Sequence, residues 1–134
     1  MSTQDTDKTH LHTRSQQDAA KVYEKVAEQK KKKEADQKEK KEQDRYSSMC
    51  QTLPVLIRTA GLMQALTFLH AKAGDAGVEQ LGNDLGETLG YTDLEKLADT
   101  ARKAELAQYM LLTQRALEQL LWYKRYAQVL LDGE

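Results

Sequence analysis

The side chains with the greatest potential for chemistry in this sequence are three histidines and a single cysteine. His10 and His12 lie close to Asp5 and Asp7, and this combination of imidazoles and carboxylates could bind a metal ion. Their segment is polar, however, and a segment without tertiary packing lacks the surrounding hydrogen bonds that orient metal ligands. We therefore expect no metal site in this part of the chain.

The other histidine and the cysteine occur in apolar surroundings. His70 follows an apolar run, which favours a surface or partner-contact role over catalysis. Cys50 lies on an apolar helical face, where core packing is commoner than a nucleophilic role. The sequence has no glycine-rich phosphate loop after a strand and no Cys/His cluster with zinc spacing. We expect a protein without enzyme activity, cofactor or metal.

Basic side chains are therefore the best candidates for a binding site, which would involve phosphates or partner carboxylates. A helix that begins at Pro54 would place Arg58 in its first turn, against the helix dipole, and this placement favours an external anion. Lys124 takes an apolar position in a helical stripe, and it could either extend to solvent or reach a phosphate or a partner carboxylate. The full set of candidates is Lys21, Lys25, Arg58, Arg115, Lys124 and Arg125.

The last predicted helix carries two of these candidates on one flank. Arg115 and Arg125 are nearly three helical turns apart, and Trp122 shares their flank. Aromatic side chains beside basic ones could stack on nucleic-acid bases. The adjacent leucine stripe favours core packing instead for all three aromatic residues, Trp122, Tyr123 and Tyr126.

The composition predicts helices to position these side chains. The 134 residues are rich in Ala, Leu, Lys, Glu and Gln, which lose little on entering a helix, and include one Pro. We expect an all-α fold, a compact bundle of five or six helices with a long C-terminal helix. Residues 1–13 are expected to be a disordered tail, and residues 14–134 a single helical-bundle domain.

An apolar stripe begins after Arg14 and fades in a charged stretch, residues 30–45. Two interpretations of this stretch stay open. It could be an exposed helical arm or turn region, supported by local ion pairs such as Glu34 with Lys38. Alternatively, the four consecutive lysines at 30–33 could contact phosphates, although acidic residues are interleaved with the basic ones.

Apolar spacing returns at Tyr46, and the single proline follows soon after. Proline is tolerated in the first turn of a helix, so we expect a new helix at Pro54, capped by Thr52. Gly61 is expected to mark a kink or a close helix contact. Residues 74–77 are expected to form a loop.

Three further patterns complete the bundle. Residues 78–90 should form a helix in which Gly82 and Gly86 let a neighbouring helix or a partner approach. Thr92 to Glu95 fits a capping box and predicts a short helix after it. Residues 105–131 carry the strongest stripe, which we expect to face the core: Leu106, Met110, Thr113, Leu117, Leu120, Lys124, Ala127 and Leu131.

Charge and hydropathy restrict the environment. The formal net charge is −1, so any nucleic-acid site must be a local patch. The N-terminal segment resembles no signal peptide, and no stretch approaches the roughly 20 apolar residues of a membrane span. A lone cysteine fits a reducing compartment. We expect a cytoplasmic protein that does not contact membranes.

Two segments resemble a known family, the small helical subunit of type III-B CRISPR RNA-guided effector complexes, called Cmr complexes. The first segment comprises Leu53-Pro54, Ile57, Gly61-Leu62, Gln64, Leu66, Phe68-Leu69 and Lys72. The second comprises Thr113, Ala116-Leu117, Leu120 and Trp122-Tyr123-Lys124-Arg125-Tyr126-Ala127. Ala19-Ala20, Val22-Tyr23 and Val26 resemble the family's first helix more weakly.

This resemblance implies a helical bundle without nuclease activity that stacks in several copies. The copies would form a minor filament beside the repeated backbone subunits that hold the guide RNA, and would line the groove of the guide–target duplex. The implied partners are the repeated backbone subunits, the large subunit, copies of the chain itself, and guide and target RNA. The alternative from a different class is a helical protein–protein adaptor without a nucleic-acid role.

Overall fold

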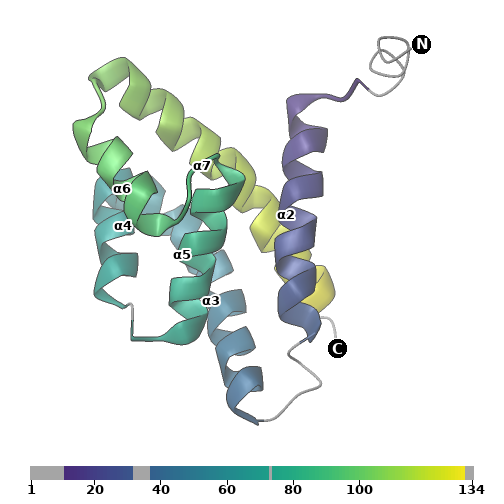
Figure 1. Cartoon of the computed structure of the whole chain (residues 1–134). Coiled ribbons are helices and arrows are strands. Elements are labelled where there is room, and N and C mark those ends of the chain that lie inside the picture. Colours follow the sequence, from purple (N-terminus) through teal and green to yellow (C-terminus); the bar gives the residue numbers. More distant parts are fainter. Residues whose placement is uncertain (1–10, 32–36, 73, 132–134) are drawn as a thin grey trace.

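Six α-helices and one π-helical turn make up the part of the chain that the computed structural model describes, residues 11–31, 37–72 and 74–131 (Figure 1). No strand occurs among these residues, which confirms the predicted all-α class and helix number. The elements are α2 (Arg14–Lys31), α3 (Gln37–Ala60), α4 (Leu62–Ala71), α5 (Ala76–Thr88), α6 (Leu94–Lys103), α7 (Leu106–Tyr126) and η2 (Ala127–Leu131).

Helix α2 begins where the sequence predicts, because a reciprocal pair of hydrogen bonds caps it. The backbone N–H of Gln16 donates to Thr13 Oγ1 (3.0 Å), and the backbone N–H of Thr13 donates to Gln16 Oε1 (2.8 Å). Of the expected disordered tail, residues 1–10 lie outside the described residues. Helix α2 then packs along α7, on the right of Figure 1.

The expected start of a helix at Pro54 is wrong, because α3 runs through this residue from Gln37 to Ala60. Thr52 does not cap a helix; its hydroxyl donates to the carbonyl of Ser48 (3.0 Å), as a threonine within a helix often does. A proline inside a helix removes one hydrogen bond and clashes with the preceding turn. Burial on both sides of Pro54 outweighs this penalty, since α3 packs against α4, α5 and α7.

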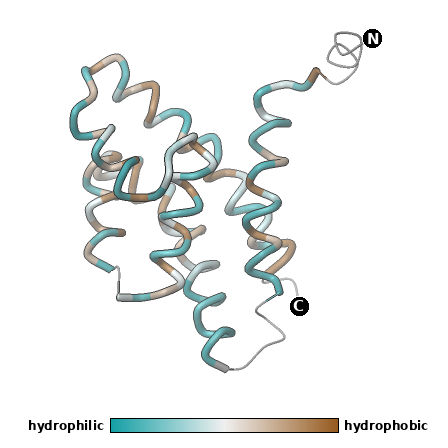
Figure 2. Tube along the Cα trace, in the orientation of Figure 1, coloured by the Kyte–Doolittle hydropathy of each residue, from teal (hydrophilic) through white to brown (hydrophobic). Residues whose placement is uncertain are grey.

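The charged stretch at 30–45 is helical where it is described. Helix α2 ends at Lys31 and α3 begins at Gln37, so the stretch contributes the ends of two helices. Two of the four consecutive lysines, and Glu34 of the expected ion pair, lie outside the described residues. Hydrophilic residues dominate the tube at the start of α3 (Figure 2).

The predicted kink at Gly61 is a complete break between two helices. Gly61 has a φ of 94°, a conformation that residues with a Cβ rarely adopt, so the chain leaves α3 here and starts α4 at Leu62. The backbone N–H of Met63 is satisfied by the hydroxyl of Tyr109 on α7 (3.0 Å). The short α4 is thereby held against the start of α7.

Glycines let α5 approach its neighbours closely. A Cβ on Gly82 would lie 2.9 Å from a Leu94 side-chain carbon, and one on Gly86 would lie 2.4 Å from the Asp93 carbonyl oxygen, which confirms the expected close contacts. Gly77 was expected in a loop, but it lies inside α5. A Cβ added to Gly77 would lie 2.2 Å from the Glu42 carbonyl oxygen of α3.

The residue that caps α6 also differs from the prediction. Asp93, not Thr92, is the N-cap, and its carboxylate accepts from the backbone N–H of Lys96 (2.9 Å). An aspartate caps at least as well as a threonine, so the neighbouring residue displaces the expected cap by one position. The helix itself was correctly predicted.

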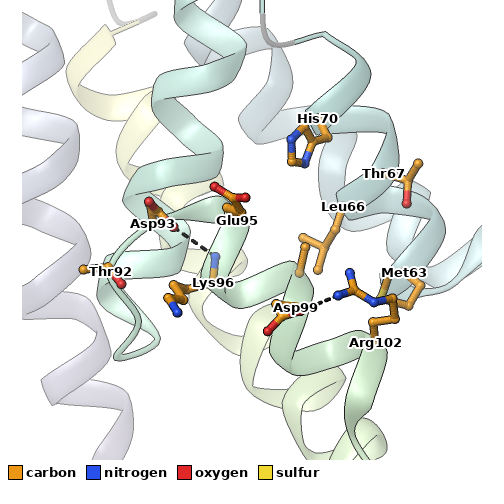
Figure 3. A pocket seen from close by; sticks show the side chains of 11 residues that line it. Met63, Leu66, Thr67, His70, Thr92, Asp93, Glu95, Lys96, Asp99 and Arg102 are labelled. Atoms are coloured by element: carbon orange, nitrogen blue, oxygen red, sulfur yellow. Dashed lines mark hydrogen bonds and ion pairs between the residues drawn. The ribbon is translucent and has the colours of Figure 1, made fainter.

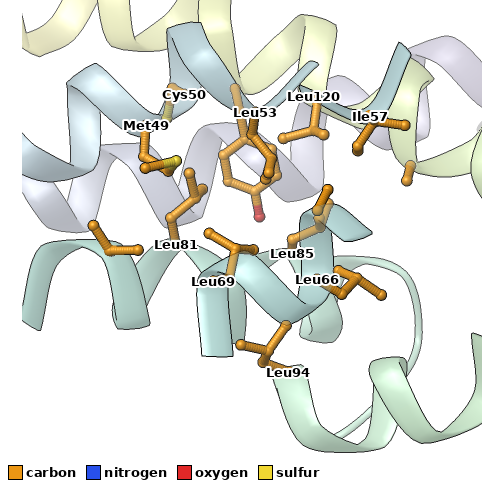
Figure 4. Packing of buried hydrophobic residues seen from close by; sticks show 14 of the residues in the cluster. Met49, Cys50, Leu53, Ile57, Leu66, Leu69, Leu81, Leu85, Leu94 and Leu120 are labelled. Carbon is orange, nitrogen blue, oxygen red and sulfur yellow. The ribbon is translucent and has the colours of Figure 1, made fainter. Parts of the chain in front are cut away.

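The core lies where α3, α4, α5 and α7 meet (Figure 4). Cys50 is fully buried among apolar side chains, which confirms its predicted packing role. Ile57 and the leucines of α4 are also buried as expected. The side chains that Figure 4 labels are Met49, Cys50, Leu53, Ile57, Leu66, Leu69, Leu81, Leu85, Leu94 and Leu120.

The long stripe of α7 is buried only in its C-terminal half. Leu120, Ala127 and Leu131 are buried as predicted, but Leu106 and Met110 are 73% and 61% exposed, and the prediction is wrong for them. An ideal helix drifts about 20° per heptad against a strict seven-residue repeat, or about 70° over this stripe. A stripe with this spacing therefore cannot face one core along its whole length.

Candidate partner and phosphate interface

Arg115 is held inside the bundle by two carboxylates. Its guanidinium donates from Nη1 and Nη2 to the Asp18 carboxylate of α2 (2.9 and 2.8 Å), and from Nη1 to Glu118 (2.7 Å). The Asp18 side chain is only 3% exposed. Such a fork-shaped pair fixes both position and orientation, so Arg115 joins α2 to α7.

Gln119 extends this polar network to α5. Its amide nitrogen donates to Asp18 (3.0 Å) and to the Thr88 carbonyl (2.9 Å). Burial by itself raises the pKa of Asp18, but hydrogen bonds from Arg115 and Gln119 outweigh it and hold that pKa below its ordinary value. The same carboxylate raises the pKa of Arg115, which stays charged.

A second buried carboxylate, Asp84 on α5, forms no ion pair with any cation in the described part of the chain. It accepts hydrogen bonds from the Tyr46 hydroxyl (2.7 Å) and from Gln80 (2.8 Å). Burial raises the pKa of Asp84, and these two hydrogen bonds offset it only in part. The candidate cation Lys25 lies nearby but forms its ion pair with Glu87.

We expect Asp84→Asn to keep or increase stability at neutral pH. The raised pKa of the folded state means that the contribution of Asp84 is fully present below the unfolded value of 3.8 and is lost as the pH rises through the folded value. The free energy of unfolding of the variant should therefore increase relative to that of the wild type as the pH rises from about 4 to about 7. Urea unfolding at several pH values measures this, and a constant difference would contradict it.

The structure corrects the argument made for Arg58. Because α3 continues through Pro54, Arg58 lies in the last turn of a helix, where a cation is favoured by the dipole. The dipole therefore gives no reason to expect an external anion. Arg58 is exposed and forms no ion pair with a described residue, so it stays available to a partner.

The other candidates lie on or beside α7. Lys21 is exposed on α2, one turn after Asp18, and Arg125 is exposed on α7 with its guanidinium carbon 5.8 Å from the Trp122 ring centre. Lys124 is half-buried, so the two interpretations of its role stay open. Of the six candidates, Arg115 and Lys25 are engaged in ion pairs within the bundle.

Two adjoining grooves follow the outer side of α7 and bring several of these residues together. One, of about 550 Å³, lies between Arg58 and α7 residues that include Met110 and Leu117. The other, of about 440 Å³, lies between the start of α2 and Arg125. Both are lined by Glu118 and Leu121. This surface, which we call the outer face of α7, combines an apolar centre with a basic rim, as protein interfaces do.

Sequence analysis missed the internal ion pairs of two residues in this arrangement, Asp18 and Arg14. Asp18 takes a position on the buried stripe of α2 with Val22 and Val26, and a carboxylate in an apolar stripe is a signal for a buried partner cation. Arg14, which pairs with Glu118 (3.1 Å), gave no comparable signal because it lies outside the stripe.

The aromatic residues of α7 divide between core and surface. Tyr123 is fully buried, with its hydroxyl 3.1 Å from that of Thr88, which supports the predicted packing role. Trp122 and Tyr126 are half-buried and stack with ring centres 5.5 Å apart, and Tyr23 of α2 meets Tyr126 edge-on at 5.4 Å. These rings mainly seal the contact between α2 and α7.

A third groove lies elsewhere, between α4 and α6, and has a volume of about 860 Å³ (Figure 3). His70 is exposed at its edge, as the sequence predicts, and Asp99 pairs with Arg102 within α6. Among the described residues no group of three or more His, Cys, Asp or Glu side chains is placed to hold a metal ion. None of the described helices is long and apolar enough to cross a membrane.

A family model described as "CRISPR-associated protein (Cas_Cmr5)" matches residues 14–130, almost the whole helical part of the chain. The chain belongs to the Cmr5 family. A relative named "CRISPR system Cmr subunit Cmr5", from Thermus thermophilus, is 45% identical over 122 residues, which are 91% of this chain and 99% of that protein.

The fold agrees with Cmr5 membership. The crystal structure of a CRISPR-associated Cmr5 family protein from Thermus thermophilus superimposes with a TM-score of 0.76 at 44% identity, over 89% of this chain and 98% of that chain. The resemblance inferred from the sequence is therefore confirmed. The outer face of α7 lies within the region that the Cmr5 family model matches.

Proposed function

We propose that this chain is a non-catalytic structural subunit of a type III-B CRISPR ribonucleoprotein, the Cmr complex, in the cytoplasm. It stacks in several copies alongside the guide–target RNA duplex, and it binds the backbone subunits, the large subunit and RNA phosphates. The observation that carries the proposal is membership of the Cmr5 family over residues 14–130. The relative's name as a Cmr subunit supports the same assembly.

Guides differ in sequence, so a subunit beside the duplex must contact the phosphate backbone and not particular bases. Exposed cations suit this task when no described carboxylate pairs with them, and Lys21, Arg58 and Arg125 are such residues on α2, α3 and α7. A few contacts per copy are weak, but repetition along a filament multiplies them. A chain with a net charge of −1 can therefore take part in RNA binding.

We expect the triple reversal Lys21→Glu, Arg58→Glu and Arg125→Glu to weaken incorporation into the Cmr complex assembled on RNA. Each lost phosphate contact should reduce the slope of log affinity against log salt by about 0.7 to 0.9, so loss of three contacts should reduce the slope by about 2 to 3. Thermal unfolding should change little, because these side chains are exposed. Binding of labelled RNA and of the RNA-loaded complex at several salt concentrations measures the effect.

A control variant reverses three exposed cations elsewhere, Lys72 at the C-cap of α4 and Lys96 and Lys103 on α6, and should leave the salt slope unchanged. If both triple variants behave alike, the effect is one of net charge and the assigned phosphate contacts are wrong. If the chain joins the other Cmr subunits but RNA never affects its binding, the protein is a helical adaptor. Metal-dependent cleavage of RNA by the purified chain would contradict a non-catalytic role.

A further inference from the structure

The outer face of α7 carries a row of apolar side chains that the described part of the chain covers only in part. Leu106, Met110 and Leu121 are 73%, 61% and 41% exposed, and Leu117 between them is half-buried. Steps of four, seven and four residues place these four side chains on one stripe of the helix, with polar residues at its middle. We call this row the α7 seam: Leu106, Met110, Thr113, Gln114, Leu117 and Leu121.

The α7 seam has the same pattern in both directions. Two apolar residues four positions apart, Leu106 and Met110, precede the polar middle, and two more with the same spacing, Leu117 and Leu121, follow it. The point between Thr113 and Gln114 is equally distant from Met110 and Leu117, and equally distant from Leu106 and Leu121. A two-fold interface needs a surface that is complementary to itself, and an antiparallel pair of identical helices obtains this from such a symmetric row.

We propose that the free chain pairs with a second copy through the α7 seam, with the two α7 helices antiparallel about a two-fold axis at Thr113 and Gln114. Leu106 then packs against the second copy's Leu121, and Met110 against the second copy's Leu117. The polar middle residues meet at the axis. Three- and four-residue spacing is the pattern that antiparallel helices use for knobs-into-holes packing.

Charges on this face do not oppose the pairing. The Glu118 carboxylate beside the α7 seam is paired with Arg14 and Arg115 of its own chain, so no isolated carboxylate is buried between the copies. Arg58 is exposed at the edge of the groove and stays at the rim. The contact is about 22 Å long, which is small for a stable dimer, so the pairing is weak and depends on concentration.

This inference goes beyond the proposed function, because it concerns the chain without RNA and without other subunits. Pairing covers the groove beside Arg58, so a paired chain cannot offer this face to another partner. Apolar contacts hold or strengthen in salt, whereas phosphate contacts weaken. The two associations therefore respond to salt in opposite ways.

Cross-linking of the full chain tests the register. Two copies of Leu106 lie about 22 Å apart in the antiparallel pair, so chains with Leu106→Cys alone should not be joined by a short thiol cross-linker. A mixture of chains with Leu106→Cys and chains with Leu121→Cys should form the mixed dimer. Gln114→Cys alone should link to itself at the axis. Cys50 is buried and common to all variants.

Val129→Cys serves as a control, because Val129 is 70% exposed on η2 and outside the α7 seam. It should give no dimer, and Met110→Glu should abolish the Gln114→Cys product. Sedimentation from about 10 µM to about 1 mM should show a monomer–dimer equilibrium that salt does not weaken. Absence of dimer over this range, or sedimenting species larger than a dimer, would overturn the proposal and leave the proposed function untouched.

Discussion

Arg115→Met is expected to lower the free energy of unfolding by about 3 kcal/mol at neutral pH. The substitution removes both hydrogen bonds from the guanidinium to Asp18, whose side chain is 3% exposed. A buried carboxylate without its cation keeps the desolvation penalty and loses the compensation. Because the Arg115 side chain is 22% exposed, the expected loss lies at the lower end of the range of about 3–5 kcal/mol for breaking a buried ion pair. Urea unfolding followed by circular dichroism measures it.

Two further variants separate the ion pair from simple loss of packing. Glu118→Gln leaves the Arg115–Asp18 pair intact. It weakens only the more exposed pairs that Glu118 forms with Arg115 and Arg14, and should change stability by less than about 1 kcal/mol. Asp18→Leu combined with Arg115→Met removes both charges and should recover much of the loss. A double variant as unstable as Arg115→Met would show that the buried charge is not the cause.

The effect of Arg115→Met should also depend on pH. The pKa of Asp18 is depressed in the folded wild type, so its contribution is present above the unfolded value of 3.8 and is lost as the pH falls through the folded value. In the variant, burial is no longer outweighed, and protonation of Asp18 relieves the penalty. The stability difference should therefore narrow on acidification from about pH 6 to about pH 4.

The second large effect is expected for Gly77→Ala. A Cβ at this position would lie 2.2 Å from the Glu42 carbonyl oxygen and 3.0 Å from the Tyr46 backbone nitrogen, both in α3. Alanine favours the helix by about 1 kcal/mol, but the clash is with backbone, so α3 and α5 must separate. Overpacking costs about 1–3 kcal/mol or more, and the short clash distance places the cost at this site near about 3 kcal/mol. After the gain in helix propensity is subtracted, the free energy of unfolding should fall by about 2 kcal/mol.

Gly74→Ala is the matched control for Gly77→Ala. A Cβ at Gly74 meets nothing within 4 Å, and its φ is not positive, so the change should be near neutral. Thermal and urea unfolding of both variants measures the contrast. A stabilised Gly77→Ala variant would mean that α3 and α5 do not approach as closely as the structure has them.

Arg115→Met and the triple reversal of Lys21, Arg58 and Arg125 bear differently on the proposed function. Arg115 was a candidate for phosphate contact, but two carboxylates already hold its guanidinium, so the proposal relies on the exposed cations. Loss of RNA-dependent assembly in Arg115→Met would need to be compared with its loss of stability. Loss of assembly in Lys21→Glu, Arg58→Glu and Arg125→Glu at unchanged stability has no such ambiguity.

The sequence by itself determined the all-α class, the long last helix, the start of the first described helix at Arg14 and the short helix after Thr92. Helix propensity, apolar period and capping act over a few residues, so the linear chain contains them. It also identified the buried role of Cys50. The family resemblance rested on the order and spacing of two apolar segments, which are likewise properties of the linear chain.

Only the tertiary structure decided what long-range packing controls. Burial against α4, α5 and α7 carries α3 through Pro54, and this reverses the dipole argument for Arg58. The partner of Arg115 is Asp18, 97 positions away, and no local pattern joins the two. Leu106 is 73% exposed although it belongs to the apolar row of α7, because a heptad-like row drifts around a helix and neighbouring helices cover only part of its surface.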